Sequence, residues 1–307
     1  MAQPETVAQN RLSRRLVPRV ATRSLMPYAF VLPAFAIYAA FLLWPLGRVV
    51  EMSLWNWDGL SPTHTWIGFQ NYAQAVSDPQ FASAVLHNAE WVAMAAAPIL
   101  GGLALAVILD YAKPRGWIIY RTIFFMPYMM PLVVTAIIWQ WMYDPNWGVL
   151  NSVLRAIGLT HWQQDWLGDP HIALVALAMA ANWTGYGFCM MLFLAGLASM
   201  DRTPLEAARV DGANSWQQFW YVTLPELSNT LNVVVLIVFI ATVRVFDYVF
   251  VTTAGGPAGA TDVLGTLIYR NTFQNQNVGY GAALAVITGA IILVGSLVYL
   301  IRRERSE

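Results

Sequence analysis

A few charged side chains interrupt long apolar runs, and their types and spacing could do chemistry. Arg244 and Asp247 lie three residues apart in one such run, so on a helix they would share a face and could form an ion pair. Charges inside a membrane segment normally face a cavity or a protein partner. The sequence therefore leaves two interpretations open, a structural ion pair or part of a transport path.

A second polar group lies near the middle of another apolar run and contains Asn182, Trp183 and Tyr186. Aromatic rings can stack on the C–H faces of a sugar, while an amide can form hydrogen bonds with its hydroxyls. Tyr248, next to Asp247, completes the candidate substrate path. Two glycines close to Tyr186 favour close helix packing instead, in which case these aromatic side chains only fill space.

The sequence contains no motif for catalysis, metal binding or phosphate binding. ATP hydrolysis by a P-loop needs a lysine in G-x-x-x-x-G-K-[ST], and the only lysine, Lys113, lies outside any such pattern. H-E-x-x-H and G-x-S-x-G are absent, and the four histidines lack metal-ligand spacing. We therefore predict that the chain is not an enzyme and binds no metal or cofactor. Its zero net charge also argues against nucleic acid as a partner.

The composition places these residues in a membrane protein, because 58% of the chain is hydrophobic and only 11% is charged. About twenty apolar residues are needed to span a bilayer as a helix. Six runs meet this length, near 28–50, 89–110, 119–142, 172–199, 229–251 and 279–301. The sequence thus predicts an all-α, polytopic protein in contact with membrane lipid, with a transmembrane domain at 28–301 between tails at 1–27 and 302–307.

The distribution of Lys and Arg predicts the orientation in the membrane. Thirteen of them lie in the two tails and in the second–third and fourth–fifth connections. The opposite connections hold only Arg48, Arg155 and Arg270. Because basic residues concentrate on the cytoplasmic side, both termini and the connection at 200–228 are predicted to be cytoplasmic.

The connection at 200–228 is polar and carries helix signals of its own. Thr203 with Glu206 predicts a capping box at a helix start, and Gly212 predicts the helix end. Ser215 with Gln218 repeats the capping pattern, and Pro225 is expected to end or redirect the second helix. A plain connector needs only about two to eight residues. We therefore expect two short helices that dock another protein, with a self-capped connector as the alternative.

The spacing in this connection resembles the signature of permease subunits of binding-protein-dependent ABC importers. The pattern is E-A-A, three residues, Gly, nine residues, an aliphatic residue, one residue and Leu-Pro, with Val222 at the aliphatic position. In that family the loop forms a coupling helix that sits in a cleft of the cytoplasmic ATPase. The resemblance implies this role for Glu206, Ala207, Ala208, Asp211, Gly212, Leu224 and Pro225.

Segments 121–151, 246–257 and 68–81 resemble the maltose and multiple-sugar permeases, and the likeness extends over about 25–300. This implies a permease for a sugar or sugar derivative that works by alternating access. The implied partners are a second homologous permease, an ATPase dimer that binds ATP-Mg, and an extracytoplasmic solute-binding protein. Glycerol-phosphate-type substrates are the alternative within the family. A secondary transporter, with inverted repeats and broken helices, and a channel are the alternatives outside it.

Overall fold

The computed structural model describes residues 26–304, so most of the predicted amino-terminal tail and the last three residues of the chain lie outside it. The chain divides into two compact units, 1–47 and 48–307. The described part of the first unit contains α1 (Met26–Tyr38), a π-helical turn (Ala39–Leu43) and the start of α2 (Trp44–Met52). Together they form an apolar helix long enough to cross a membrane.

A small folded region opens the second unit. Strands β1 (Trp55–Asn56) and β2 (Thr65–Trp66) pair antiparallel, and α3 (Gln70–Ser77) follows. The buried Asn71 side chain donates to the carbonyl oxygens of Ser53 at 2.8 Å and Trp55 at 3.0 Å. Buried amides need such partners, so these two hydrogen bonds fix α3 against β1.

The second apolar helix is longer than the sequence predicts. It consists of α4 (Pro79–Met94) and α5 (Ala96–Ala112) and therefore starts ten residues before the predicted position. Asp78 caps it by accepting the Gln80 N–H at 2.8 Å, with Pro79 at the first helical position. At the other end Lys113 takes a left-handed conformation and ends α5.

The third predicted membrane helix, 119–142, is broken. It comprises α6 (Trp117–Phe125), a 3₁₀ turn (Met126–Met129) and α7 (Leu132–Met142), bent by 96°. Pro131 explains the break, because it has no N–H to donate and holds Met130 in an extended conformation (ψ 143°). An apolar run shows that a segment is buried in lipid, but it does not show whether the segment is straight.

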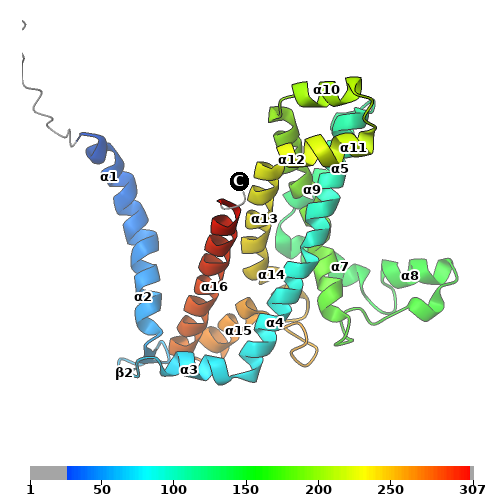
Figure 1. Cartoon of the computed structure of the whole chain (residues 1–307). Helices are drawn as coiled ribbons and strands as arrows, with labels where there is room; N and C mark the ends of the chain where they lie inside the picture. The colour runs from blue at the N-terminus through cyan, green and yellow to red at the C-terminus, as the bar shows by residue number, and fades with distance from the viewer. Residues whose placement is uncertain (1–25, 305–307) are drawn as a thin grey trace, which may run out of the picture. The chain divides into compact units, whose positions relative to one another are not determined.

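The core forms where α5 crosses α9 (Ala173–Ser199), and the two helices lie side by side in Figure 1. Gly102 permits the close crossing, since a Cβ there would lie 2.5 Å from the Cβ of Cys189. Around this crossing the side chains of Met190, Phe193 and Leu197 are fully buried. The predicted helix 172–199 is confirmed.

The fifth predicted helix is interrupted near its end. It comprises α13 (Ser228–Val243) and α14 (Asp247–Thr252), and α15 (Leu264–Tyr269), a π-helical turn (Arg270–Gln274) and α16 (Val278–Glu304) complete the chain. By length and composition, five helical segments within residues 26–304 can cross a membrane, or six if bent α6–α7 is one span. The all-α, six-helix prediction agrees with the higher count.

Candidate functional site

Residues 200–228, called loop 200–228 below, fold as a helical unit at the end of the second unit farthest from α3 (Figure 1). The unit contains α10 (Thr203–Val210), α11 (Ser215–Gln218), a π-helical turn (Phe219–Thr223) and α12 (Leu224–Glu226). The prediction of short helices joined at a bend is confirmed. Gly212 ends the first of them with φ +83°, a conformation that glycine takes without strain.

The predicted capping box at the start of α10 is wrong. The N-cap position is Arg202, whose side chain makes no capping hydrogen bond; the preceding Asp201 carboxylate instead accepts the Thr203 N–H at 2.9 Å. This hydrogen bond lowers the pKa of Asp201. Within the described residues, the carboxylate of Glu206 accepts no capping hydrogen bond. It lies exposed on the outer side of α10, where it is free to contact another protein.

The second capping box lies one residue earlier than predicted. Asn214 is the cap, accepting the Gln217 N–H while Gln217 accepts the Asn214 N–H, both at 2.9 Å. The predicted partner Gln218 is instead buried, donating to the Ala213 carbonyl at 2.7 Å and accepting from the Arg209 side chain at 3.3 Å. Gln218 therefore joins the two halves of the unit.

Pro225 does not end the second helix. The chain stays helical through Pro225 to Glu226, and the preceding π-helical turn has the Leu224 N–H donate to the Phe219 carbonyl. A wider turn of this kind leaves room for a residue that lacks an N–H. The second helical piece ends at Glu226, one residue after Pro225 and before α13 begins at Ser228, so the predicted end lies within one residue of the observed one.

Both ends of loop 200–228 are fixed to two consecutive residues of α5. Arg202 donates two hydrogen bonds to the carboxylate of Asp110, both at 2.8 Å, and the Tyr111 hydroxyl lies 2.6 Å from that of Thr223. These hydrogen bonds from Arg202 to the Asp110 carboxylate raise the pKa of Arg202. Sequence reasoning missed these contacts. The available signal was an acidic residue at the end of an apolar run and a basic residue at the start of the loop.

The outer face of loop 200–228 combines charge with exposed apolar side chains. Leu205 is buried and Ala208 half-buried, so this face of α10 packs inward. Glu206, Ala207 and Asp211 are exposed, and the side chain of Val210 is 87% exposed. Trp216, Trp220 and Tyr221 are also exposed. Exposed apolar side chains grouped on a polar loop are typical of a protein-binding surface.

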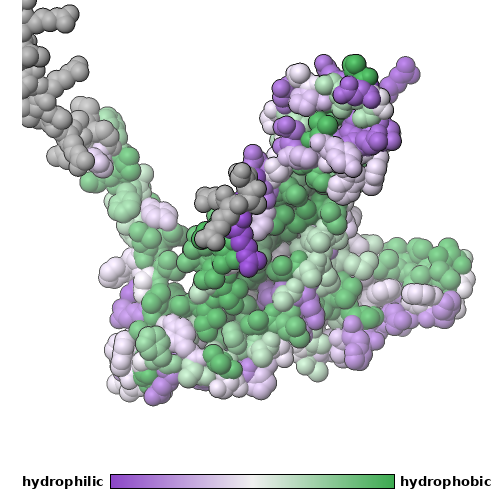
Figure 2. Space-filling view, in the orientation of Figure 1, coloured by the Kyte–Doolittle hydropathy of each residue, from purple (hydrophilic) through white to green (hydrophobic). Residues whose placement is uncertain are grey.

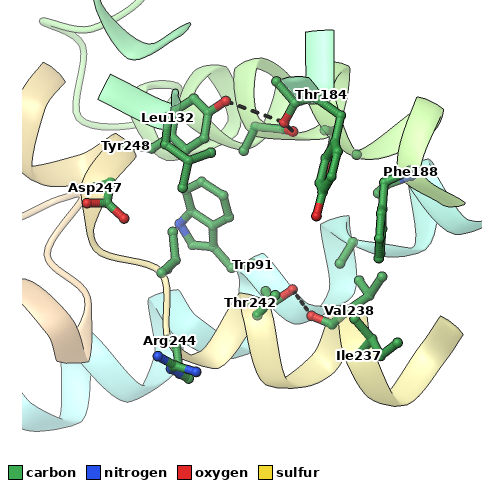
Figure 3. Close-up of a pocket in the computed structure, with 18 of the residues that line it drawn as sticks. Trp91, Leu132, Thr184, Phe188, Ile237, Val238, Thr242, Arg244, Asp247 and Tyr248 are labelled. Carbon is green, nitrogen blue, oxygen red and sulfur yellow. Dashed lines mark hydrogen bonds between the residues drawn. The ribbon is translucent and has the colours of Figure 1, made fainter. Parts of the chain in front are cut away.

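A cavity of about 420 Å³ lies among α4, α7, α9, α13 and α14 (Figure 3). Of the six predicted path residues, four line it: Asn182, Arg244, Asp247 and Tyr248. The Asn182 amide donates to the Met94 carbonyl at 3.1 Å, and the Tyr248 hydroxyl lies 3.4 Å from the Thr184 hydroxyl. Sequence reasoning did not single out the other lining residues, which include Trp91, Tyr128 and Phe188.

Arg244 and Asp247 form no ion pair with each other in the described part of the chain. The helix breaks between them: α13 ends at Val243 and α14 begins at Asp247. Because the break removes the helical period, the two side chains do not share a face, and Figure 3 shows them apart at the cavity. The structure therefore overturns the ion-pair interpretation and leaves two separately exposed charges.

Trp183 and Tyr186 are not among the residues that line the cavity. The Trp183 ring contacts Trp139 edge-on at 5.8 Å between centroids. A Cβ on Gly101 would lie 2.4 Å from the Tyr186 ring, so this ring packs directly against α5. Trp183 and Tyr186 therefore pack between helices, as the alternative interpretation of the sequence proposes.

A second polar cluster lies at the opposite end from loop 200–228. Asp262, which is only 6% exposed, accepts two hydrogen bonds from Arg270, at 2.6 and 2.8 Å. His87 contacts the Asp262 carbonyl at 2.7 Å, and Asn88 accepts the Leu264 N–H at 2.8 Å. These bonds fix the segment after α14 against α4.

Membrane-length helices around a mostly apolar cavity with a few polar side chains, and a folded helical loop at one end, fit the membrane subunit of a transporter. The model of the family described as "Binding-protein-dependent transport system inner membrane component" matches residues 99–306. The chain belongs to this family. It is a multi-pass inner-membrane permease subunit of an ABC importer, and it is not itself an enzyme.

Curated relatives are similar along nearly their whole length. A probable ABC transporter permease of Bacillus subtilis is 33% identical over 91% of this chain and 96% of the relative. A diacetylchitobiose uptake permease of Streptomyces coelicolor is 31% identical over 90% of this chain and 81% of the relative. A trehalose/maltose transport permease of Thermococcus litoralis is also 31% identical, over 95% of this chain and 97% of the relative.

The fold is similar to that of a solved transporter. The structure matches a chain of a bacterial ABC transporter involved in the import of the acidic polysaccharide alginate, with a TM-score of 0.78 and 25% identity. The match covers 92% of this chain and 96% of that chain.

Proposed function

We propose that this permease imports a sugar or sugar derivative, together with a second homologous permease subunit. A solute-binding protein delivers the substrate from outside, and a cytoplasmic ATPase dimer that binds ATP-Mg supplies the energy. The diacetylchitobiose and trehalose/maltose names of two relatives and the alginate transporter support a saccharide substrate. The family description supports dependence on a binding protein.

One observation carries the coupling role: loop 200–228 presents an exposed face while its ends are fixed to α5. Glu206, Ala207 and Val210 are free to contact the ATPase. The Arg202–Asp110 and Tyr111–Thr223 contacts transmit a displacement of the loop to α5. Because α5 packs along α9, which lines the cavity, movement of the loop changes the cavity.

Alternating access follows from this connection. Closure of the ATPases on ATP draws the two coupling loops of the permease pair together, and the membrane helices open outward. An equilibrium between two conformations moves only when a ligand binds them with different affinity. ATP binds the closed ATPase dimer more tightly than the open one, and so favours closure. The contacts at the ends of the loop transmit the resulting movement to the membrane helices.

The cavity favours an uncharged sugar over a glycerol-phosphate-type substrate. Asn182 offers an amide, Tyr128 and Phe188 offer stacked rings 4.7 Å apart, and Arg244 and Asp247 have opposite charges. A phosphate dianion is best bound by several cations or by a bidentate arginine without a neighbouring carboxylate. Here the negative charge of Asp247 in the same cavity would repel a phosphate that Arg244 attracts.

The proposed orientation places both termini and loop 200–228 in the cytoplasm, supported by the thirteen-to-three distribution of basic residues. A reporter fused after Glu307 that proves external would contradict it. In this orientation α3 and the Asp262–Arg270 cluster face outward, where the binding protein docks.

Purification of the tagged chain from its native membrane tests the proposed class. We expect an ATPase and a second permease to co-elute, and we expect a panel of sugars to raise the melting temperature of the companion binding protein. A chain that takes up solute alone, driven by an ion gradient and with no ATPase, would be a secondary transporter. Melting shifts with glycerol phosphates but with no sugar would reverse the substrate assignment.

A further inference from the structure

An amphipathic arm projects from the external ends of two membrane helices and has no role in the function proposed above. It joins α7 to α9 through residues 143–172 and contains α8 (Val149–Ala156) and a 3₁₀ turn (Thr160–Trp162). Figure 1 shows it extending sideways from the helices. Since both ends continue into membrane helices, the arm is attached at the bilayer surface.

The arm is a folded unit, and Asn151 forms its centre. The buried Asn151 amide donates to the carbonyls of Pro145 at 3.2 Å and Gln164 at 2.8 Å, and its oxygen accepts the Trp166 indole N–H at 2.9 Å. The Trp166 ring in turn packs on Tyr143 at the end of α7. Because these contacts fix α8, its faces have defined directions.

One face of α8 is apolar and exposed. Val149, Val153 and Ile157 are 50–63% exposed and follow each other at four-residue spacing, so they line up on one side of the helix. Trp147 precedes this face and Trp162 follows it, with exposures of 62% and 59%. No charged residue belongs to this row, which is called the α8 apolar row below.

The polar groups of the arm lie elsewhere. Ser152 and Arg155 occupy the other exposed side of α8. Asp144, Asp165 and Asp169 cap local turns by accepting backbone N–H groups. In Figure 2 the arm is green on the side toward loop 200–228 and purple on the opposite side. Its apolar surface therefore points in the direction in which the membrane helices run toward that loop.

We propose that the α8 apolar row lies in the outer leaflet of the bilayer and makes the arm an interfacial anchor of the permease. Helices of this type lie in the interface with the apolar face inserted and the polar face in water. Tryptophan at both ends fits the headgroup level, where amphipathic rings concentrate. The side chains of Ile137 and Trp141 on α7, the membrane helix that leads into the arm, are also exposed.

A lipid surface fits this row better than a protein partner does. The row is aliphatic with tryptophan only at its ends, and it lacks the central aromatic or arginine anchor typical of protein interfaces. The arm would resist tilting of α7 and α9 against the bilayer when the cavity opens. This inference requires the proposed orientation, but it does not require the ATPase or the substrate.

Single-cysteine labelling tests the proposal in the intact transporter, reconstituted in liposomes with its co-purifying subunits. Ile157→Cys places an environment-sensitive fluorophore on the row, and Arg155→Cys is the matched control on the polar side. The native Cys189 is fully buried and stays in place. The two readouts are quenching by nitroxide on the lipid acyl chain and quenching by aqueous iodide.

We expect lipid nitroxide to quench the label at position 157 several-fold more than the label at 155, and iodide to show the reverse order. Strong iodide quenching at both positions would place the row in water and overturn the proposal. Protection of position 157 from both quenchers would show a protein cover and also overturn it. Intact sugar uptake with either of these results would leave the proposed function standing.

Discussion

Arg202 and Asp110 join the start of loop 200–228 to the end of α5 through two charge-assisted hydrogen bonds of 2.8 Å each. The carboxylate side chain is 12% exposed and the guanidinium side chain 37%. A bidentate pair fixes orientation as well as distance. The pair therefore holds the start of the loop in a defined orientation against the end of α5.

Breaking this pair should uncouple ATP hydrolysis from transport without preventing folding. Arg202→Gln leaves the Asp110 carboxylate without its charged partner and removes hydrogen bonds worth about 1.5–3 kcal/mol. We expect more ATP hydrolysed per solute imported, measured in liposomes. The exchanged pair Asp110→Arg with Arg202→Asp should recover part of the coupling. An unchanged ratio in the single variant would exclude a transmitting role.

The cap of α10 should depend on Asp201 and hardly on Thr203. Asp201→Ala removes the acceptor of the Thr203 N–H, whereas Thr203→Ala keeps both that N–H and its acceptor. Amide hydrogen exchange at residues 203–206 should therefore rise more in the Asp201 variant. Equal exchange in the two variants would restore Thr203 as the cap.

The same cap should have a defined pH dependence. The pKa of Asp201 is lower in the folded protein than its ordinary value, so the cap stabilises the fold fully above that ordinary value. Its contribution is lost as the pH falls through the lowered folded value. The difference in hydrogen exchange between wild type and Asp201→Ala should thus disappear only as the pH falls below the ordinary pKa of an aspartate. A difference that disappears near neutral pH would contradict this assignment.

The variants Arg244→Gln and Asp247→Asn should each fold with nearly normal yield. The two residues form no ion pair, so removing one charge does not leave the other without a partner that it had before. Each should lower sugar uptake, since both side chains line the cavity. The measurements are folded yield by size-exclusion chromatography and uptake in liposomes. If the single variants fail to fold but the double variant folds, the two residues form an ion pair in the membrane.

Arg270→Gln should destabilise the protein strongly, because it leaves Asp262 buried without its countercharge. Breaking a buried pair costs about 3–5 kcal/mol, and the 28% exposure of Arg270 places the expected loss near the lower end. Arg48→Gln is the matched control: its ion pair with Glu51 is 47% and 46% exposed and is worth about 0–1 kcal/mol. Thermal unfolding in detergent measures both. Similar losses in the two variants would contradict the buried-pair account.

The sequence predicts the membrane segments well because lipid imposes a simple rule on length and polarity. It predicts breaks poorly: Pro131 bends one segment, and the break around Arg244 separates two charges that the helical period places together. Cap positions shift by one or two residues because Asp, Asn, Ser and Thr all serve as caps. Backbone geometry selects Asp201 and Asn214.

The cavity and the loop contacts were less predictable than the helices. Asn182 and Tyr248 line the cavity as expected, whereas Trp183 and Tyr186 lie on faces of α9 that do not line it. Whether a side chain points into the cavity depends on which face of its helix packs against the neighbouring helices. A helix that is apolar on all sides gives no sequence signal for that face. The contacts of Asp110 and Tyr111 with the loop join residues about a hundred positions apart.

Binding of the ATPase to the exposed face of loop 200–228 can be tested with one pair of substitutions. Val210→Asp places a charge on this face, and Val76→Asp makes the same change at an 80% exposed valine on α3, at the opposite end of the second unit. The measurement is the amount of ATPase that co-purifies with each tagged, folded variant. We expect loss of the ATPase with Val210→Asp and wild-type recovery of the ATPase with Val76→Asp. Full recovery of the ATPase with both variants would contradict this expectation.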